Sequence, residues 1–146
     1  MALLALLHGR VGRTLLRSLP DYLQWIFGSE RERPLVLYRM RSLFSLQLSD
    51  IGMRSPGLLR LVAALREQTQ LYLLDISYNN FTLRGTRALL HSLKDPSFLP
   101  SLTVLMMRET MALDGEPEDA WDEHVAEFEE FEASGRASRM TFFNQG

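Results

Sequence analysis

Hydrophobic residues recur in the same order almost three times between residues 43 and 110. In the first two copies every offset matches, whereas the third repeats only the beginning. The copies are Leu43, Leu46, Leu48, Met53, Gly57, Leu61 and Leu65, then Leu71, Leu74, Ile76, Phe81, Gly85, Leu89 and Leu93, then Leu102, Leu105 and Met107. They start 28 and then 31 residues apart, which is typical of stacked supersecondary units. The pattern therefore predicts a repeat fold.

Each of the first two copies changes its hydrophobic period halfway along. Leu74 and Ile76 flank the polar Asp75, and this alternation predicts a short strand with one buried face. Farther on, Leu89 and Leu93 lie four residues apart, with more apolar residues between them, which predicts one buried face of a helix. So short a unit of strand, turn and helix cannot bury its own apolar face. Successive units should therefore stack and align their strands in parallel.

The pattern resembles the leucine-rich repeat, in the long form with a convex helix that is found in ribonuclease-inhibitor-like proteins. The match is fullest in the middle copy, where Asn79 follows the strand at the expected position, whereas the other copies have Ile51 and Thr110 there. In that family the asparagine side chain satisfies backbone groups at the turn after the strand, so the resemblance assigns this role to Asn79 alone. It implies an α/β fold, a short leucine-rich-repeat solenoid with a parallel sheet and convex helices, capped by N- and C-terminal helices.

Two interpretations fit the segment before the repeats. Residues 1–19 contain Arg10, Arg13 and Arg17, no acidic residue and many leucines, as in a mitochondrial presequence. The segment could equally form a helix that caps the first repeat, and the two roles are compatible; a third alternative is contact with a membrane surface. We therefore treat residues 1–27 as an N-terminal cap or uncleaved targeting segment. Residues 28–113 form the predicted repeat domain, in which Leu35–Tyr38 could add a short leading strand.

The last third of the chain, residues 114–146, is acidic. Its aromatic and apolar residues at steps of 4, 3 and 3 are Trp121, Val125, Phe128 and Phe131. This spacing predicts an amphipathic helix from about 117 to 133. The helix could cap the last strand, or it could dock into another subunit or meet a basic surface. The tail at 140–143 is too apolar to remain free, so we expect it to pack on this chain or on a neighbour.

Composition narrows the class of protein. At 146 residues the chain is long enough for one core. It has no cysteine, which excludes disulfides and thiolate metal sites and fits a reducing compartment. No apolar run is long enough for a membrane-spanning helix. The net charge of −2 hides an asymmetry, because residues 1–113 carry +6 and residues 114–146 carry −8. These two parts are expected to attract each other.

Signals for catalysis are scarce. His8, His91 and His124 belong to three different segments, so we expect surface or interface residues rather than a shared site. No glycine-rich phosphate loop and no G-x-S-x-G elbow is present. We therefore expect no enzyme, no cofactor and no metal. The arginines of the first half could contact RNA, but without interleaved aromatic residues protein carboxylates are the better counterparts.

The surface best suited to binding is the outer face of the predicted sheet. In the family, outward positions flank the buried strand leucines. Here these positions are Ser45, Gln47 and Ser49, then Leu73, Asp75 and Ser77, then Val104, Met106 and Arg108. An apolar centre with charged edges is typical of interfaces, although a terminal helix could instead cover this face. The partner-binding residues that we expect are Leu73, Asp75, Tyr78, Val104, Met106, Arg108, Trp121 and Phe128.

These patterns favour a noncatalytic protein-interaction or structural subunit of a multiprotein complex. Similarity to small mitochondrial leucine-rich-repeat subunits implies a respiratory-chain or ATP synthase complex. The alternatives are a mitochondrial ribosomal accessory subunit and a cytoskeletal or axonemal adaptor, and the alternative location is the cytoplasm. The expected partners are other protein subunits, with no small-molecule substrate, no membrane span and nucleic acid at most indirectly.

Overall fold

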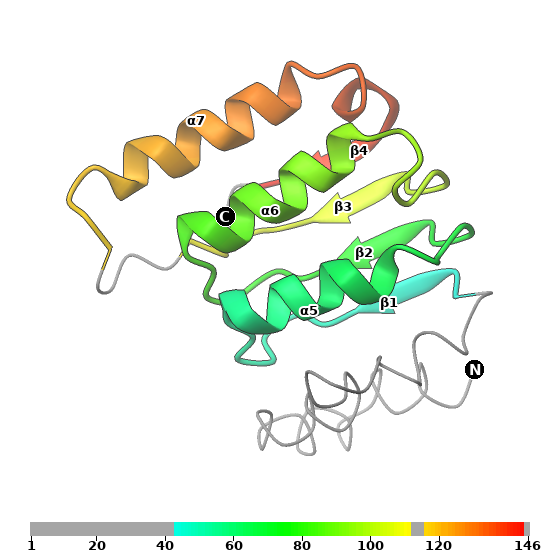
Figure 1. Ribbon diagram of the computed structural model, residues 1–146, viewed down its shortest axis with the longest axis horizontal. Coiled ribbons are helices and arrows are strands. Elements are labelled where there is room, and N and C mark those ends of the chain that lie inside the picture. The colour runs from blue at the N-terminus through cyan, green and yellow to red at the C-terminus, as the bar shows by residue number, and fades with distance from the viewer. Residues whose placement is uncertain (1–42, 112–115, 145–146) are drawn as a thin grey trace.

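The computed structural model describes residues 43–111 and 116–144 of the chain. These residues form an α/β fold in which three α-helices lie beside a four-stranded parallel sheet (Figure 1). In chain order the elements are β1 (Ser45–Gln47), α5 (Ser55–Leu65), β2 (Leu73–Asp75), α6 (Leu83–Lys94), β3 (Val104–Met106), α7 (Ala120–Glu132), the 3-10 helix η2 (Ala137–Arg139) and β4 (Thr141–Phe143). The α/β class and the parallel sheet are confirmed. The expected N-terminal helix and the leading strand lie outside the described residues.

The strands follow one another in the sheet as they do in the sequence. The order is β1-β2-β3-β4, and every neighbouring pair is parallel. The central residues Leu46, Leu74, Leu105 and Phe142 form one row across the sheet. The three leucines of this row are buried, and each contributes about 1.5–3 kcal/mol by leaving water. The three predicted strands therefore lie side by side, and β4 is a fourth that the pattern did not predict.

The helices form a second layer in the order α5-α6-α7 on one side of the sheet (Figure 1). Their buried leucines, among them Leu61 of α5 and Leu89 of α6, join the strand leucines in one core. Gly85 lets α5 and α6 approach closely, because a Cβ atom there would lie 2.4 Å from the hydroxyl oxygen of Ser55. That hydroxyl accepts a hydrogen bond from the backbone N–H of Thr82 (2.9 Å). The N-terminus of α6 is thus fixed against the N-terminus of α5.

Asn79 joins the turns that follow β1 and β2. Its side-chain oxygen accepts hydrogen bonds from the backbone N–H groups of Ile51 (3.2 Å) and Met53 (2.9 Å). Its amide nitrogen donates to the backbone oxygens of Leu48 (2.9 Å) and Ile76 (2.8 Å). The side chain is buried, where unpaired backbone groups are costly. The expected role of Asn79 in satisfying backbone groups is therefore confirmed.

A left-handed residue follows each of the first three strands at the same distance. Asp50, Tyr78 and Glu109 have φ angles of 52°, 57° and 48°, and each is the third residue after its strand ends. None is a glycine, although this backbone region favours glycine and asparagine. The three turns therefore share a left-handed residue at the same position despite their different side chains.

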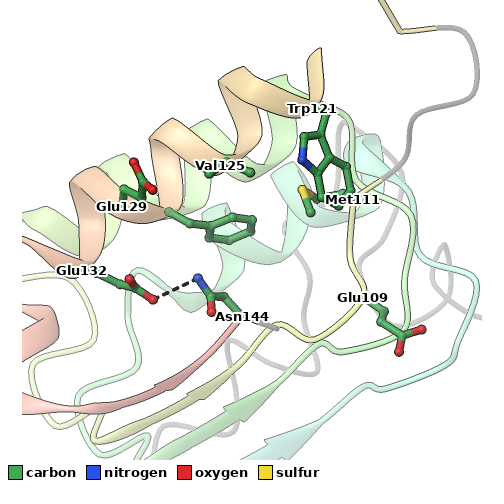
Figure 2. Close-up of a pocket in the computed structure, with 8 residues that line it drawn as sticks. Glu109, Met111, Trp121, Val125, Glu129, Glu132 and Asn144 are labelled. Carbon is green, nitrogen blue, oxygen red and sulfur yellow. Dashed lines mark hydrogen bonds between the residues drawn. The ribbon is translucent and has the colours of Figure 1, made fainter. Parts of the chain in front are cut away.

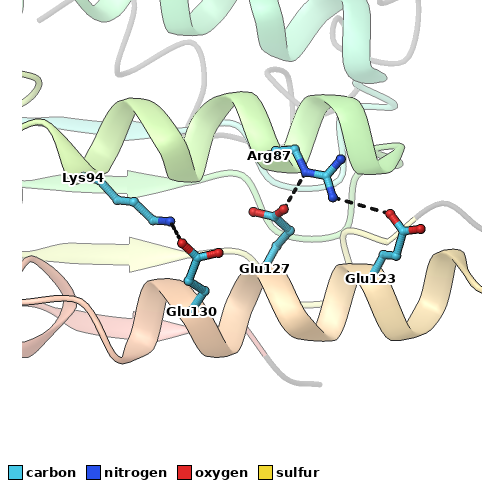
Figure 3. Close-up of polar contacts among 5 residues, drawn as sticks. All are labelled: Arg87, Lys94, Glu123, Glu127 and Glu130. Atoms are coloured by element: carbon cyan, nitrogen blue, oxygen red, sulfur yellow. Dashed lines mark hydrogen bonds and ion pairs between the residues drawn. The ribbon is translucent and has the colours of Figure 1, made fainter.

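The C-terminal segment extends both layers. Helix α7 lies within the predicted range of 117 to 133 and packs against α6, while β4 pairs with β3. Phe131 of α7 is buried and meets Phe142 of β4 edge to face, with ring centroids 5.1 Å apart. Where α7 faces α6, Arg87 contacts Glu123 (3.4 Å) and Glu127 (2.5 Å), and Lys94 pairs with Glu130 (Figure 3). The segment thus combines an aromatic core with surface ion pairs.

Candidate functional site

The side of the sheet turned away from the helices carries the strongest candidate surface. The outward residues Leu73, Val104 and Met106 are all partly exposed, as expected. Leu73 lies opposite Val104, and Asp75 lies opposite Met106, in the register of β2 and β3. Helix α7 packs beside α6 rather than over this face. The sheet register therefore places four of the predicted residues in one patch, which we call the sheet face.

An aromatic pair adjoins the sheet face at the beginning of β1 and β2. The rings of Phe44 and Tyr72 are stacked, with centroids 5.0 Å apart and an interplanar angle of 1°. Their exposed fractions are 62% and 39%. Sequence reasoning missed this pair, although both residues precede a strand by the same number of positions. Large exposed aromatic side chains are common anchors in protein interfaces.

Ser77 corrects the predicted row of outward residues, because it is buried. Strand β2 ends at Asp75, so the alternation of inward and outward side chains does not continue to Ser77. Its hydroxyl oxygen accepts a hydrogen bond from the backbone N–H of Arg108 (3.1 Å), and the Asp75 carboxylate accepts one from the backbone N–H of Ser77 (3.0 Å). Ser77 is therefore a buried residue whose hydrogen bonds fix the backbone at the edge of the sheet face, and it is not part of the surface.

Tyr78 and Arg108 lie together at the end of the sheet face. The backbone N–H of Tyr78 donates to the backbone oxygen of Arg108 (2.7 Å). The Tyr78 side chain is 49% exposed, and Arg108 is partly exposed. Both were predicted as binding residues, and the structure brings them to one place.

Trp121 and Phe128 belong to a different place, a cavity of about 630 Å³ beside α7 (Figure 2). Its walls come from α7, from the segment after β3 and from the residue after β4, and are formed by Glu109, Met111, Trp121, Val125, Phe128, Glu129, Glu132 and Asn144. Trp121 is 49% exposed, whereas Phe128 is buried. The structure thus places Trp121 and Phe128 in one cavity with three carboxylates. Leu73 and Met106 do not line this cavity.

His124 corrects a second expectation, since it was predicted at the surface or an interface and is fully buried. It lies on the face of α7 that also buries Ala120, Phe128 and Phe131. Neither ring nitrogen has a hydrogen-bond partner among the described residues. Burial lowers the pKa of His124, and the nearby Glu116 carboxylate opposes this shift. The imidazole is therefore neutral at pH 7. By contrast, His91 is exposed, as expected.

The remaining electrostatic features stabilise the surface of the fold. The hydrogen bond from Lys94 lowers the pKa of Glu130, and the bond with Glu127 raises the pKa of Arg87. The guanidinium of Arg136 donates to the backbone oxygens of Phe98 (3.2 Å) and Leu99, in the connection between α6 and β3. These contacts attach the C-terminal segment to α6 and to the connection that follows it.

The described residues offer no constellation for metal-assisted chemistry. Within 43–111 and 116–144, no three acidic or histidine side chains converge on a point where a metal ion could bind. In the same part of the chain, each helix is too short or too polar to cross a membrane. In this part of the chain the candidate surfaces are the sheet face and the cavity beside α7.

No protein-family model matches this chain, and no curated protein matches it.

Proposed function

We propose that this protein is a noncatalytic interaction subunit of a larger protein assembly and that it docks through the sheet face. The observation that carries the proposal is the patch of partly exposed apolar residues, Leu73, Val104 and Met106, bordered by Asp75 and Arg108. Surfaces with an apolar centre and charged edges are typical of protein interfaces. Short parallel strands hold the patch on a rigid sheet, so little ordering is needed on binding.

The turn at Tyr78 supports this proposal independently. A tyrosine in the left-handed region costs on the order of 1 kcal/mol of backbone strain, and φ at Tyr78 is 57°. The side chain is half exposed, so burial within the chain does not compensate for this cost. Strain of this kind is often retained at functional positions. Contact between Tyr78 and a partner would account for a tyrosine here.

We also propose that the fold is a short leucine-rich-repeat solenoid with convex helices. Three features support this: the aligned strand leucines, the Asn79 hydrogen bonds and the shared left-handed turns. In a solenoid each unit contacts only its neighbours. The sheet face then corresponds to the concave surface that such proteins use for binding.

The location that we propose is the mitochondrion, within a respiratory-chain or ATP synthase complex. The proposal is supported by the arginines and leucines of residues 1–19, which lie outside the described residues. Import of the tagged full chain into isolated mitochondria tests it. Protection of the chain from added protease, dependent on the membrane potential, is expected. Failure of import would favour the cytoskeletal adaptor.

The main test combines Leu73→Arg with Met106→Glu in the tagged full-length chain. Two charges on the sheet face should abolish co-purification of the partner subunits, because unpaired charges in an interface are costly to desolvate. The matched control combines Ala63→Arg with Ala126→Glu, two exposed positions on α5 and α7. The control should retain every partner, and circular dichroism should be unchanged in both variants.

Two outcomes would contradict the proposal. Retained partners in the sheet-face variant would place the interface elsewhere. Loss of the complex after nuclease treatment would favour the ribonucleoprotein subunit instead.

Tyr78→Asn gives a sharper second test. Asparagine tolerates the left-handed conformation, so the variant should unfold at a slightly higher temperature while its affinity for the partner falls. Asp50→Asn, at the equivalent turn after β1, should leave binding unchanged. A variant that is both more stable and fully able to bind would remove Tyr78 from the interface.

A further inference from the structure

The cavity beside α7 is not explained by docking through the sheet face. Figure 2 shows Trp121 and Met111 together at one end of it and Glu132 and Asn144 at the other. The amide nitrogen of Asn144 donates to a carboxylate oxygen of Glu132 (2.9 Å), and this hydrogen bond closes that end. A cavity of about 630 Å³ lies within the size range of small-ligand and anchor-residue sites. We call it the α7 pocket.

The α7 pocket has an uncompensated negative charge. Three carboxylates line it, those of Glu109, Glu129 and Glu132, and no basic side chain is among the described residues of its lining. Elsewhere on α7, Glu123 and Glu127 pair with Arg87 of α6, and Glu130 pairs with Lys94 of the same helix (Figure 3). Within the part of the chain that the structure describes, no hydrogen bond or ion pair is recorded for the side chain of Glu109 or Glu129. The charge at the pocket is therefore available to a ligand.

The rest of the lining is apolar and partly aromatic. Trp121 is half exposed at the mouth, and Met111, Val125 and Phe128 add apolar surface. A tryptophan face attracts a cation, and a carboxylate pairs with one most strongly when both are shielded from water. Aromatic and acidic groups around one cavity thus select a ligand that is both apolar and positively charged.

The positions of the carboxylates indicate the shape of that ligand. Glu109 lies at one end of the pocket, and Glu129 and Glu132 lie towards the other end (Figure 2). Glu109 follows β3, whereas Glu129 and Glu132 both belong to α7, and the three carboxylates do not converge on one point, as they would around a single small cation. Spaced charges around an apolar centre fit a polypeptide with basic residues on both sides of an apolar anchor.

We propose that the α7 pocket docks a segment of a partner protein in which large apolar residues are flanked by Arg or Lys. The apolar residues occupy the cavity against Trp121 and Val125. The flanking cations pair with Glu109 at one end and with Glu129 and Glu132 at the other. The surface shares no residue with the sheet face, so the proposal stands or falls separately from the proposed function.

The test uses two synthetic peptides and the full-length chain. One peptide is acetyl-Ser-Arg-Leu-Leu-Arg-Ser-amide, and the other has both arginines replaced by citrulline, which is similar in shape but uncharged. Binding is followed by NMR through the indole N–H signal of Trp121, assigned with Trp121→Phe. The arginine peptide should shift this signal saturably, and the citrulline peptide should bind about tenfold more weakly, as expected for lost charge-assisted hydrogen bonds. Added salt should weaken the binding of the arginine peptide but not that of the citrulline peptide.

Two charge-matched double variants locate the binding site. Glu129→Gln with Glu132→Gln removes two carboxylates from the pocket and should weaken the arginine peptide by about tenfold or more. Glu123→Gln with Glu130→Gln removes two carboxylates that face α6 and should leave peptide binding unchanged. Circular dichroism checks that both variants retain their helices.

Three results would overturn the proposal. The first is the absence of a saturable shift of Trp121 at millimolar arginine peptide. The second is equal binding of the arginine and citrulline peptides. The third is binding of benzyltrimethylammonium at least as tightly as the arginine peptide, which would make the pocket a site for small cations. None of these results bears on docking through the sheet face.

Discussion

The middle of the molecule and its C-terminal part both pack a helix layer against the sheet, but different side chains fill their cores. From β1 to β3, stacked leucines fill the core, and the buried Asn79 side chain links successive turns. From α7 to β4, phenylalanines replace the leucines, and ion pairs attach the helix to α6. A packing scheme that repeats can be recognised in the sequence by the constant spacing of its apolar residues. An irregular one shows no such constant spacing, and here it leaves the Glu129 carboxylate of α7 without an ion pair among the described residues.

The largest effect is expected from Phe131→Ala, which empties the aromatic core of the C-terminal part. Phe131 is fully buried and contacts Phe142, so the free energy of unfolding should fall by about 3–5 kcal/mol. Urea denaturation followed by circular dichroism measures this. The control Trp121→Ala, at a half-exposed position of the same helix, should cost much less. Equal losses would mean that α7 is not anchored through Phe131.

Asn79→Ala tests the middle of the molecule in the same way. The variant leaves buried backbone groups of two turns without partners, and the expected loss is about 2–4 kcal/mol. The neighbouring Asn80 is exposed, so Asn80→Ala should be close to neutral. If both variants unfold at the same urea concentration, the Asn79 hydrogen bonds do not hold the turns together.

Gly85→Ala tests the close approach of α5 and α6. The added methyl group would meet Ser55, and overpacking of this kind costs about 1–3 kcal/mol. Gly135→Ala is the control, because nothing lies within 4 Å of the methyl group there. Thermal unfolding of the two variants should differ clearly. A stabilised Gly85 variant would show that the helices can separate at little cost.

His124 should make stability depend on pH. Its pKa is lowered in the folded state by burial, so the unfolded chain binds more protons below the ordinary histidine pKa of about 6.5. The contribution of His124 to the free energy of unfolding is therefore present above about pH 6.5. It is lost as the pH falls below this value, by at most about 1.4 kcal/mol per pH unit. Urea unfolding at pH 7 and pH 5 measures the loss.

Two variants distinguish the contribution of His124 to this pH dependence from that of His91. His124→Leu should reduce the difference in stability between pH 7 and pH 5, whereas His91→Gln, at an exposed position, should not. An unchanged pH profile in His124→Leu would assign the dependence to other groups.

The smallest effect is expected from Arg87→Ala, which removes two ion pairs between α6 and α7. Arg87 is half exposed, so solvent screens the pairs and the loss should stay below about 1 kcal/mol. The difference from the parent chain should vanish in concentrated salt. A larger loss that persists in salt would show that the ion pairs, and not the aromatic core, attach α7.

The leucine pattern predicted the first three strands, their parallel order and the helices between them. Those positions repeat at fixed offsets because each unit buries the same face. Ser77 was misplaced because β2 is only three residues long, so its alternation stops before that residue. His124 was misplaced because the prediction rested on the separation of the three histidines along the sequence and not on the position of His124 around its helix. Its steps to Phe128 and Phe131 match one side of a helix and could have indicated burial.

The C-terminal strand and the α7 pocket were harder to predict. In β4 a phenylalanine stands where the other strands have a leucine, so the strand does not fit the repeat, and only the apolar character of its residues indicated packing. The pocket depends on Glu109 and Asn144, which are distant in sequence and line one cavity only because β3 and β4 are neighbours. Nothing in a linear pattern indicates that they would share a cavity.

The register of the sheet has a consequence for how the chain folds. Ser45 pairs with Leu73, Leu73 with Val104 and Val104 with Thr141, so each strand meets only the strands that immediately precede and follow it along the chain. The entropy lost in closing each loop is therefore similar at every step. No pairing has to wait for a remote segment to arrive. Folding can then add one strand at a time, in either direction, to whichever pair of strands forms first.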